Sequence, residues 1–156
     1  MGDFSSVHMA CHASQNAADP LRSRFFMHNR QFVRATGSHR WLKCVEFQVA
    51  FLSACQASTG EETLSDEAVH LAAGMLAAGY RRVVATMWSI GDAPAQEVAK
   101  DFYEYLWSQK EDNIDTTFDG TLSAYAIHHA VQRLRLRLDN TERSLLTWIP
   151  YVHFGY

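Results

Sequence analysis

Two short apolar runs separated by one helical segment constrain the fold of this chain more than any other feature. Residues 48–53, QVAFLS, and residues 83–88, VVATMW, are rich in β-branched and aromatic residues and bounded by turn residues, which is typical of buried strands. Between them, residues 64–78 have the apolar spacing of a helix that stops at Gly79. A strand, a helix and a second strand in this order predict two parallel strands joined by a crossover helix.

The rest of the chain extends this pattern. Residues 6–10 predict a first strand, residues 94–107 and 121–138 predict helices, and the segment after Pro150 predicts an edge strand. The segment RFFMHNRQFV predicts a hairpin inserted after the first strand. We therefore expect an α/β fold whose mostly parallel sheet is covered by helices on both faces. Because the strands are few and the chain starts almost directly in one, we expect it to be the C-terminal portion of a larger domain.

Apolar residues at helical spacing predict which side chains of the three helices face the sheet. They are Ala68, Leu71, Ala72, Met75, Leu76, Val98, Phe102, Tyr105, Leu106, Ala124, Ile127, Val131, Leu134 and Leu138. The arginines at 133, 135 and 137 are expected on a solvated face of the last of these helices.

The composition excludes several classes of function. With a net charge of −3, the chain is not expected to bind nucleic acid or an anionic membrane as its main role. No apolar run approaches the ~20 residues that span a bilayer, and the first residues lack the pattern of a signal peptide. The three cysteines have no spacing of a disulfide framework, which favours a reducing compartment such as the cytoplasm. No cofactor-binding motif is found, so no cofactor is predicted.

Reactive side chains gather where the predicted parallel strands end, which is where open parallel sheets bind ligands. The first strand ends at ACHA, residues 10–13, and the second at SACQ, residues 53–56. If these strands are neighbours, His12 and Cys55 emerge side by side. An imidazole beside a thiol stabilises the thiolate, which is the nucleophile of cysteine enzymes. The third strand ends in WSIGD, residues 88–92, and would form another wall of the same site.

The same residues also allow a structural interpretation. A lone cysteine in an apolar strand is most often a packing residue, and Cys11 and Cys44 are interpreted in that way. His8 is expected to be a core histidine with a satisfied hydrogen bond. The set His8, Cys11, His12 and Cys55 matches no standard zinc spacing, so no metal site is predicted.

Several motifs in this order resemble the CHAT domain, a caspase-like domain often found downstream of tetratricopeptide repeats. They are VHMACHA, then FLSACQASTGEE, then LAAGMLAAGYRRVVATMWSIGDAPAQEVAKDFYEYL, and the closing WIPYVHFGY. The resemblance covers nearly all of residues 6–156, and it implies one CHAT-like domain over residues 1–156. The implied fold is the caspase- and hemoglobinase-like three-layer sandwich.

The resemblance also implies a site and a reaction. It implies a cysteine endopeptidase with a catalytic dyad of His12 and Cys55 that cleaves a protein or peptide substrate. Caspases keep their histidine about 50 residues before their cysteine, and the spacing here is similar. Backbone N–H groups of Ala13 and Cys55 would hold the oxyanion. The implied substrate pocket is lined by Ser53, Trp88, Ser89 and Asp92. An upstream repeat or sensor domain is the implied regulatory partner.

Two departures from the family pattern keep other functions open. Ala13 stands where the family has glycine, and alanine is strained if that position needs a positive φ. The loop QASTGEE replaces a glycine-rich loop. One alternative is an inactive scaffold or interaction module with the same fold. A flavodoxin-like ligand-binding domain is a further alternative, although no Gly-x-Gly-x-x-Gly turn follows the first strand.

Overall fold

A four-stranded mixed sheet is the main element of the computed structural model, which describes residues 5–10, 12–14, 24–26, 32–34, 48–53, 66–109 and 118–156. The strand order is β1-β5-β6-β7. β1 pairs in parallel with β5 and β5 with β6, whereas β7 is antiparallel to β6. The strands are β1 (Ser6–Met9), β5 (Val49–Leu52), β6 (Arg82–Thr86) and β7 (Tyr151–Gly155).

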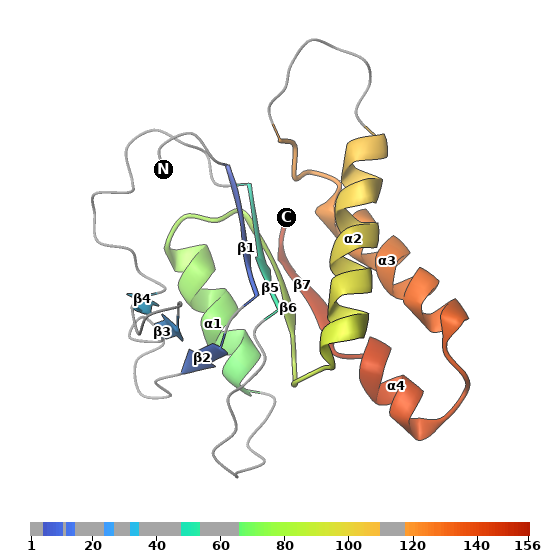
Figure 1. The fold of residues 1–156 in the computed structure, drawn as a ribbon. Coiled ribbons are helices and arrows are strands. Elements are labelled where there is room, and N and C mark those ends of the chain that lie inside the picture. The colour runs from blue at the N-terminus through green and yellow to red at the C-terminus, as the bar shows by residue number, and fades with distance from the viewer. Residues whose placement is uncertain are drawn as a thin grey trace.

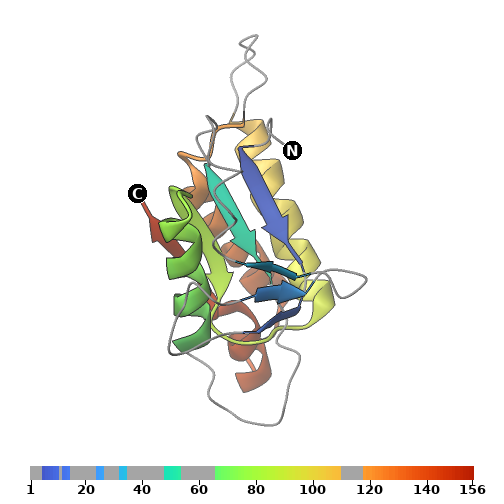
Figure 2. The same ribbon diagram turned by 90° about the vertical axis from the view of Figure 1, so that its left-hand side faces the viewer.

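A second, smaller sheet is antiparallel and lies apart from the main one. It contains β2 (His12–Ser14), β3 (Arg24–Phe26) and β4 (Phe32–Arg34), in that order. β3 and β4 form the hairpin predicted from RFFMHNRQFV. Figures 1 and 2 place this sheet beyond the ends toward which β1 and β5 point.

Helices cover both faces of the main sheet (Figure 1). α1 (Asp66–Ala77) packs on one face, and α2 (Asp92–Ser108) and α3 (Ser123–Arg137) pack on the other. The short α4 (Glu142–Trp148) follows α3 and leads into β7. The predicted α/β fold with a mostly parallel, doubly covered sheet is therefore confirmed. No helix among the described residues is long and apolar enough to cross a bilayer.

The central strand β5 supplies both hydrophobic cores. Its side chains alternate between the two faces of the sheet, as strand geometry requires. Val49 and Phe51 pack with α2 and α3, while Ala50 and Leu52 pack with α1. All four residues are buried, so β5 is held on both sides.

Eight of the fourteen core residues predicted on the helices are buried; Leu76, Tyr105, Val131 and Leu138 are half-buried, Ala124 is exposed, and the Ala68 side chain is outside the described part of the structure. Val98, Phe102 and Leu106 of α2 and Ile127 and Leu134 of α3 are buried. Tyr105 is half-buried and its ring packs on His129 at a centroid distance of 4.9 Å. Ala124 is exposed, so its prediction was wrong. The neighbouring small residue Ala126 occupies the core position instead.

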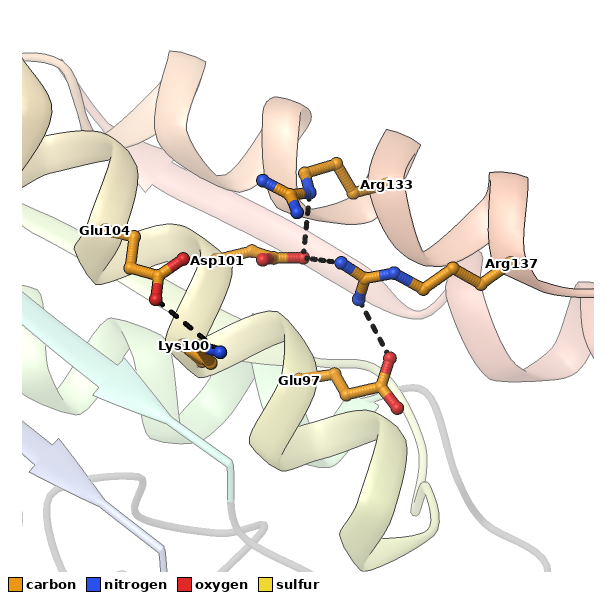
Figure 3. Close-up of polar contacts among 6 residues, drawn as sticks. All are labelled: Glu97, Lys100, Asp101, Glu104, Arg133 and Arg137. Carbon is orange, nitrogen blue, oxygen red and sulfur yellow. Dashed lines mark hydrogen bonds and ion pairs between the residues drawn. The ribbon is translucent and has the colours of Figure 1, made fainter.

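The arginines of α3 lie on an exposed face of the helix, as expected from the sequence, and each of them also has a partner on a neighbouring helix. Arg133 and Arg137 both pair with the buried carboxylate of Asp101 on α2 (Figure 3), and Arg135 lies over the Trp148 ring of α4. Helical periodicity placed them on the polar side correctly. It does not reveal that a neighbouring helix presents a carboxylate to that side.

The sequence did not predict α4. The helix has only seven residues, which is too short for a periodic pattern. Its N-terminus is capped by Thr141, whose side chain accepts a hydrogen bond from the Ser144 N–H at 3.3 Å. The Ser144 hydroxyl also donates to Asp139, which lowers the pKa of that carboxyl. A capping threonine was the available signal for this helix.

Candidate functional site at the carboxyl ends of the parallel strands

The carboxyl ends of the three parallel strands line up at one edge of the main sheet. In the register of the sheet, Met9 of β1 pairs with Leu52 of β5, and Leu52 pairs with Ala85 of β6. The three chain segments therefore leave the sheet at the same level. This is the edge at which the sequence predicted a site.

The ends of β1 and β5 are joined by a side-chain hydrogen bond. His8 Nε2 and Ser53 Oγ lie 2.9 Å apart. The Ser53 N–H also donates to the Met9 carbonyl at 3.1 Å. Ser53, predicted to line the substrate pocket, therefore has its hydroxyl engaged by His8.

His8 sits against aromatic rings on the α2 side of the sheet. Its ring centroid lies 4.8 Å from that of Phe51 and 5.8 Å from that of Tyr103 on α2. Partial burial lowers the pKa of His8 and raises the pKa of Tyr103 to about 12. The sequence predicted a satisfied core histidine. The hydrogen bond is present, but His8 is exposed at the edge strand and does not belong to the core.

His12 and Ala13 lie on β2, where they pair with Phe26 and Phe25 of β3. The sequence predicted that the first strand would end at ACHA, but β1 ends at Met9. The chain then enters the smaller sheet. His12 therefore lies in a different sheet from β5, the strand that precedes Cys55 in the sequence. Cys55 lies outside the described residues, and so do Cys11 and Cys44.

The loop after β6 carries the other predicted pocket residues. Trp88 is half-buried, and its indole Nε1 donates to the Leu146 carbonyl of α4 at 2.7 Å. The Met87 N–H donates to the Pro150 carbonyl at 2.9 Å. α4 is therefore fixed beside the end of β6, a neighbour that the sequence did not predict.

Ser89 and Asp92 are both exposed at this end of the molecule. Asp92 is the first residue of α2, where its negative charge suits the positive end of the helix dipole. Among the described residues, no group of three histidine, cysteine, aspartate or glutamate side chains is placed to hold a metal ion.

A comparison with protein families gives a match that spans the chain. The family model described as the CHAT domain matches residues 1–156. A search of curated proteins finds no match to the chain.

Proposed function

The chain belongs to the CHAT domain family, and on this premise we propose that it is a cysteine endopeptidase of the caspase-like clan. The family is related to caspase-like peptidases. In this proposal Cys55 is the nucleophile, His12 is its acid–base partner, and the fold is the caspase-like three-layer sandwich.

The register of β1 and β5 is the observation that carries this proposal. Met9 and Leu52 are paired neighbours. His12 lies three residues after Met9, and Cys55 lies three residues after Leu52. The two chain segments thus leave the sheet at adjacent positions, and the same number of residues leads from each strand end to the candidate side chain. Such a start favours a thiol and an imidazole that come within reach of each other.

The proposed reaction begins with attack of the Cys55 thiolate on the carbonyl carbon of a peptide bond. The negative charge on the carbonyl oxygen is held by the backbone N–H groups of Ala13 and Cys55. The imidazolium of His12 then protonates the leaving amine as the C–N bond breaks. Water hydrolyses the resulting thioester and regenerates the thiol.

The place of Ala13 in β2 supports an active rather than a degenerate site. A residue paired in an antiparallel strand has extended backbone, with negative φ, in which alanine is not strained. The main sequence objection to activity was that Ala13 replaces a glycine. That objection depends on a positive φ, which a paired strand residue does not need.

The pocket and partners of this enzyme follow from the same proposal. Trp88, Ser89 and Asp92 would line the pocket for the residue before the scissile bond, with Ser53 at its edge. The substrate is a protein or peptide, and an upstream repeat or sensor domain would regulate cleavage.

Covalent labelling tests the proposal directly. A peptidyl acyloxymethyl ketone should modify Cys55 of the full protein, and His12→Ala should slow that modification at least tenfold because the thiolate loses its partner. Mass spectrometry locates the label, with Cys11 and Cys44 as internal controls. Equal labelling of all three cysteines would contradict the dyad.

The second candidate function is an inactive scaffold with the same fold, which the position of His12 in the smaller sheet rather than at the end of β1 favours. The two functions differ in one measurement. A scaffold leaves Cys55 labelling unchanged by His12→Ala, whereas a peptidase does not.

A further inference from the structure

The two chain segments that carry the proposed dyad are joined where they leave the main sheet. The hydrogen bond between His8 Nε2 and Ser53 Oγ, 2.9 Å long, links β1 to the residue after β5. The backbone bond from Ser53 N–H to the Met9 carbonyl lies directly beside it.

The surroundings of His8 fix the direction of this side chain. Phe51 and Tyr103 contact the imidazole, and their own ring centroids are 6.1 Å apart. Ser53 follows Phe51 by two residues, so strand alternation places both on the same face of the sheet. The imidazole therefore lies between an aromatic surface and the Ser53 hydroxyl, which limits its rotamers.

We propose that His8 and Ser53 are positioning residues that hold the His12 segment and the Cys55 segment at a fixed separation. The inference rests on the proposed peptidase mechanism. Two residues separate Met9 from His12, and one separates Ser53 from Cys55. Because these linkers are so short, a displacement of one strand end relative to the other would also displace His12 relative to Cys55. Misplacement by about 1 Å can cost on the order of 10²-fold in rate.

The alkylation rate of Cys55 by iodoacetamide, measured against pH, tests this positioning role. Iodoacetamide is small and needs no peptide pocket, so its rate reports the thiolate fraction of Cys55. The wild-type protein gives the alkylation profile with the histidine partner present, and His12→Ala gives the profile without it. If their profiles coincide, the proposed dyad itself fails, independently of His8 and Ser53.

Two variants break the bond from opposite sides, and two serve as controls. Ser53→Ala and His8→Ala each remove one partner, so the test survives if one of them does not fold. Ser53→Thr keeps the hydroxyl and is the conservative rescue. Ser123→Ala is the matched control because Ser123 Oγ and His153 Nε2 form another serine–histidine bond of 2.9 Å, between α3 and β7.

The proposal expects both bond-breaking variants to shift the pH midpoint of Cys55 alkylation toward that of His12→Ala. At a pH below the wild-type midpoint the rate should fall roughly tenfold, since a thiolate fraction changes about tenfold per unit of midpoint shift. Ser53→Thr and Ser123→Ala should keep the wild-type midpoint. The proposal is overturned if Ser53→Ala and His8→Ala also keep it, or if Ser123→Ala shifts it equally.

Discussion

The carboxylate of Asp101 on α2 lies 3.0 Å from guanidinium Nη2 of Arg137 on α3, so this ion pair joins the two helices. The Asp101 side chain is 4% exposed, whereas that of Arg137 is 40% exposed. Arg133 approaches the same oxygen at 3.5 Å, and Arg137 also donates to Glu97 at 2.9 Å (Figure 3). The buried member of this network is the anion.

This asymmetry predicts which substitutions are costly. Removing both cations with Arg133→Met and Arg137→Met should lower the free energy of unfolding more than Asp101→Leu does. In the first case a buried charge loses its partners, while in the second the remaining arginines can be hydrated. Urea unfolding measures the difference. Lys100→Met is the control, because its pair with Glu104 is exposed and exposed pairs contribute little. Equal losses from the double variant and Asp101→Leu would contradict this account.

Gly155 should not tolerate a side chain. It has φ of 105°, and a Cβ at this position would collide with the Arg81 carbonyl oxygen. Gly155→Ala should cost about 2 kcal/mol or more, because a left-handed backbone and a steric clash both oppose it. Gly91→Ala is the matched control: its φ is −66° and the added Cβ would meet Pro94 at 3.6 Å. Thermal unfolding of the two variants should differ clearly.

The stability of the protein should decrease as pH falls below about 6.5, the ordinary histidine pKa. Burial lowers the pKa of His8, and burial together with the nearby charge of Arg82 lowers the pKa of His153. The unfolded chain therefore takes up these protons first, which favours unfolding until the pH reaches the folded-state values.

Urea unfolding between pH 7.5 and 5.5 measures this dependence. His8→Gln and His153→Gln should each flatten the loss of stability over that range. His128→Gln, at an exposed position on α3, is the comparison variant. If both His8→Gln and His153→Gln keep the pH dependence of the wild type, the lowered pKa values of these histidines are contradicted.

Trp88 should hold α4 in place beside the end of β6. Trp88→Phe keeps an aromatic ring but removes the indole N–H that donates to the Leu146 carbonyl. The expected cost is about 1 kcal/mol, the usual net value of a hydrogen bond. Hydrogen exchange should become faster at the amides of α4 and stay unchanged in α1. Equal acceleration in both helices would indicate global rather than local destabilisation.

Restoring the family glycine should bring no gain in activity. Ala13 is paired in β2, where an extended backbone suits alanine. We expect Ala13→Gly to leave Cys55 labelling unchanged and to lower stability by roughly 0.5–1 kcal/mol, the usual cost of glycine within a strand. Faster labelling of the glycine variant would show that alanine impairs the site.

The sequence predicted the main sheet well because its strands are short apolar runs separated by amphipathic helices. β5 and β6 are buried at every residue, so their patterns are unambiguous. The end of β1 was less predictable. Nothing in the local pattern of ACHA distinguishes a continuing strand from one that changes sheets, since that choice depends on the tertiary pairing of His12 with Phe26.

The sheet edge at which the site was predicted followed from the sequence, while the pairing of His12 with Cys55 stays a prediction and the contacts at that edge were not predicted. The parallel order of β1, β5 and β6 brings the carboxyl ends of these strands to one edge of the sheet, which sequence order reveals. The bond between His8 and Ser53 depends on the exact register of β1 on β5, which sequence order does not fix. The contact of Trp88 with α4 required a helix that was too short to predict.

The burial of β5 has a mechanical consequence for the proposed enzyme. β5 is enclosed between two neighbouring strands and two cores, whereas β1 has β5 as its paired neighbour in the main sheet and is only partly buried. Within the described part of the chain, displacing the strand that leads to His12 therefore breaks fewer contacts than displacing the one that leads to Cys55. A regulator of the proposed enzyme would therefore displace the segment that carries His12 more easily than the segment that carries Cys55.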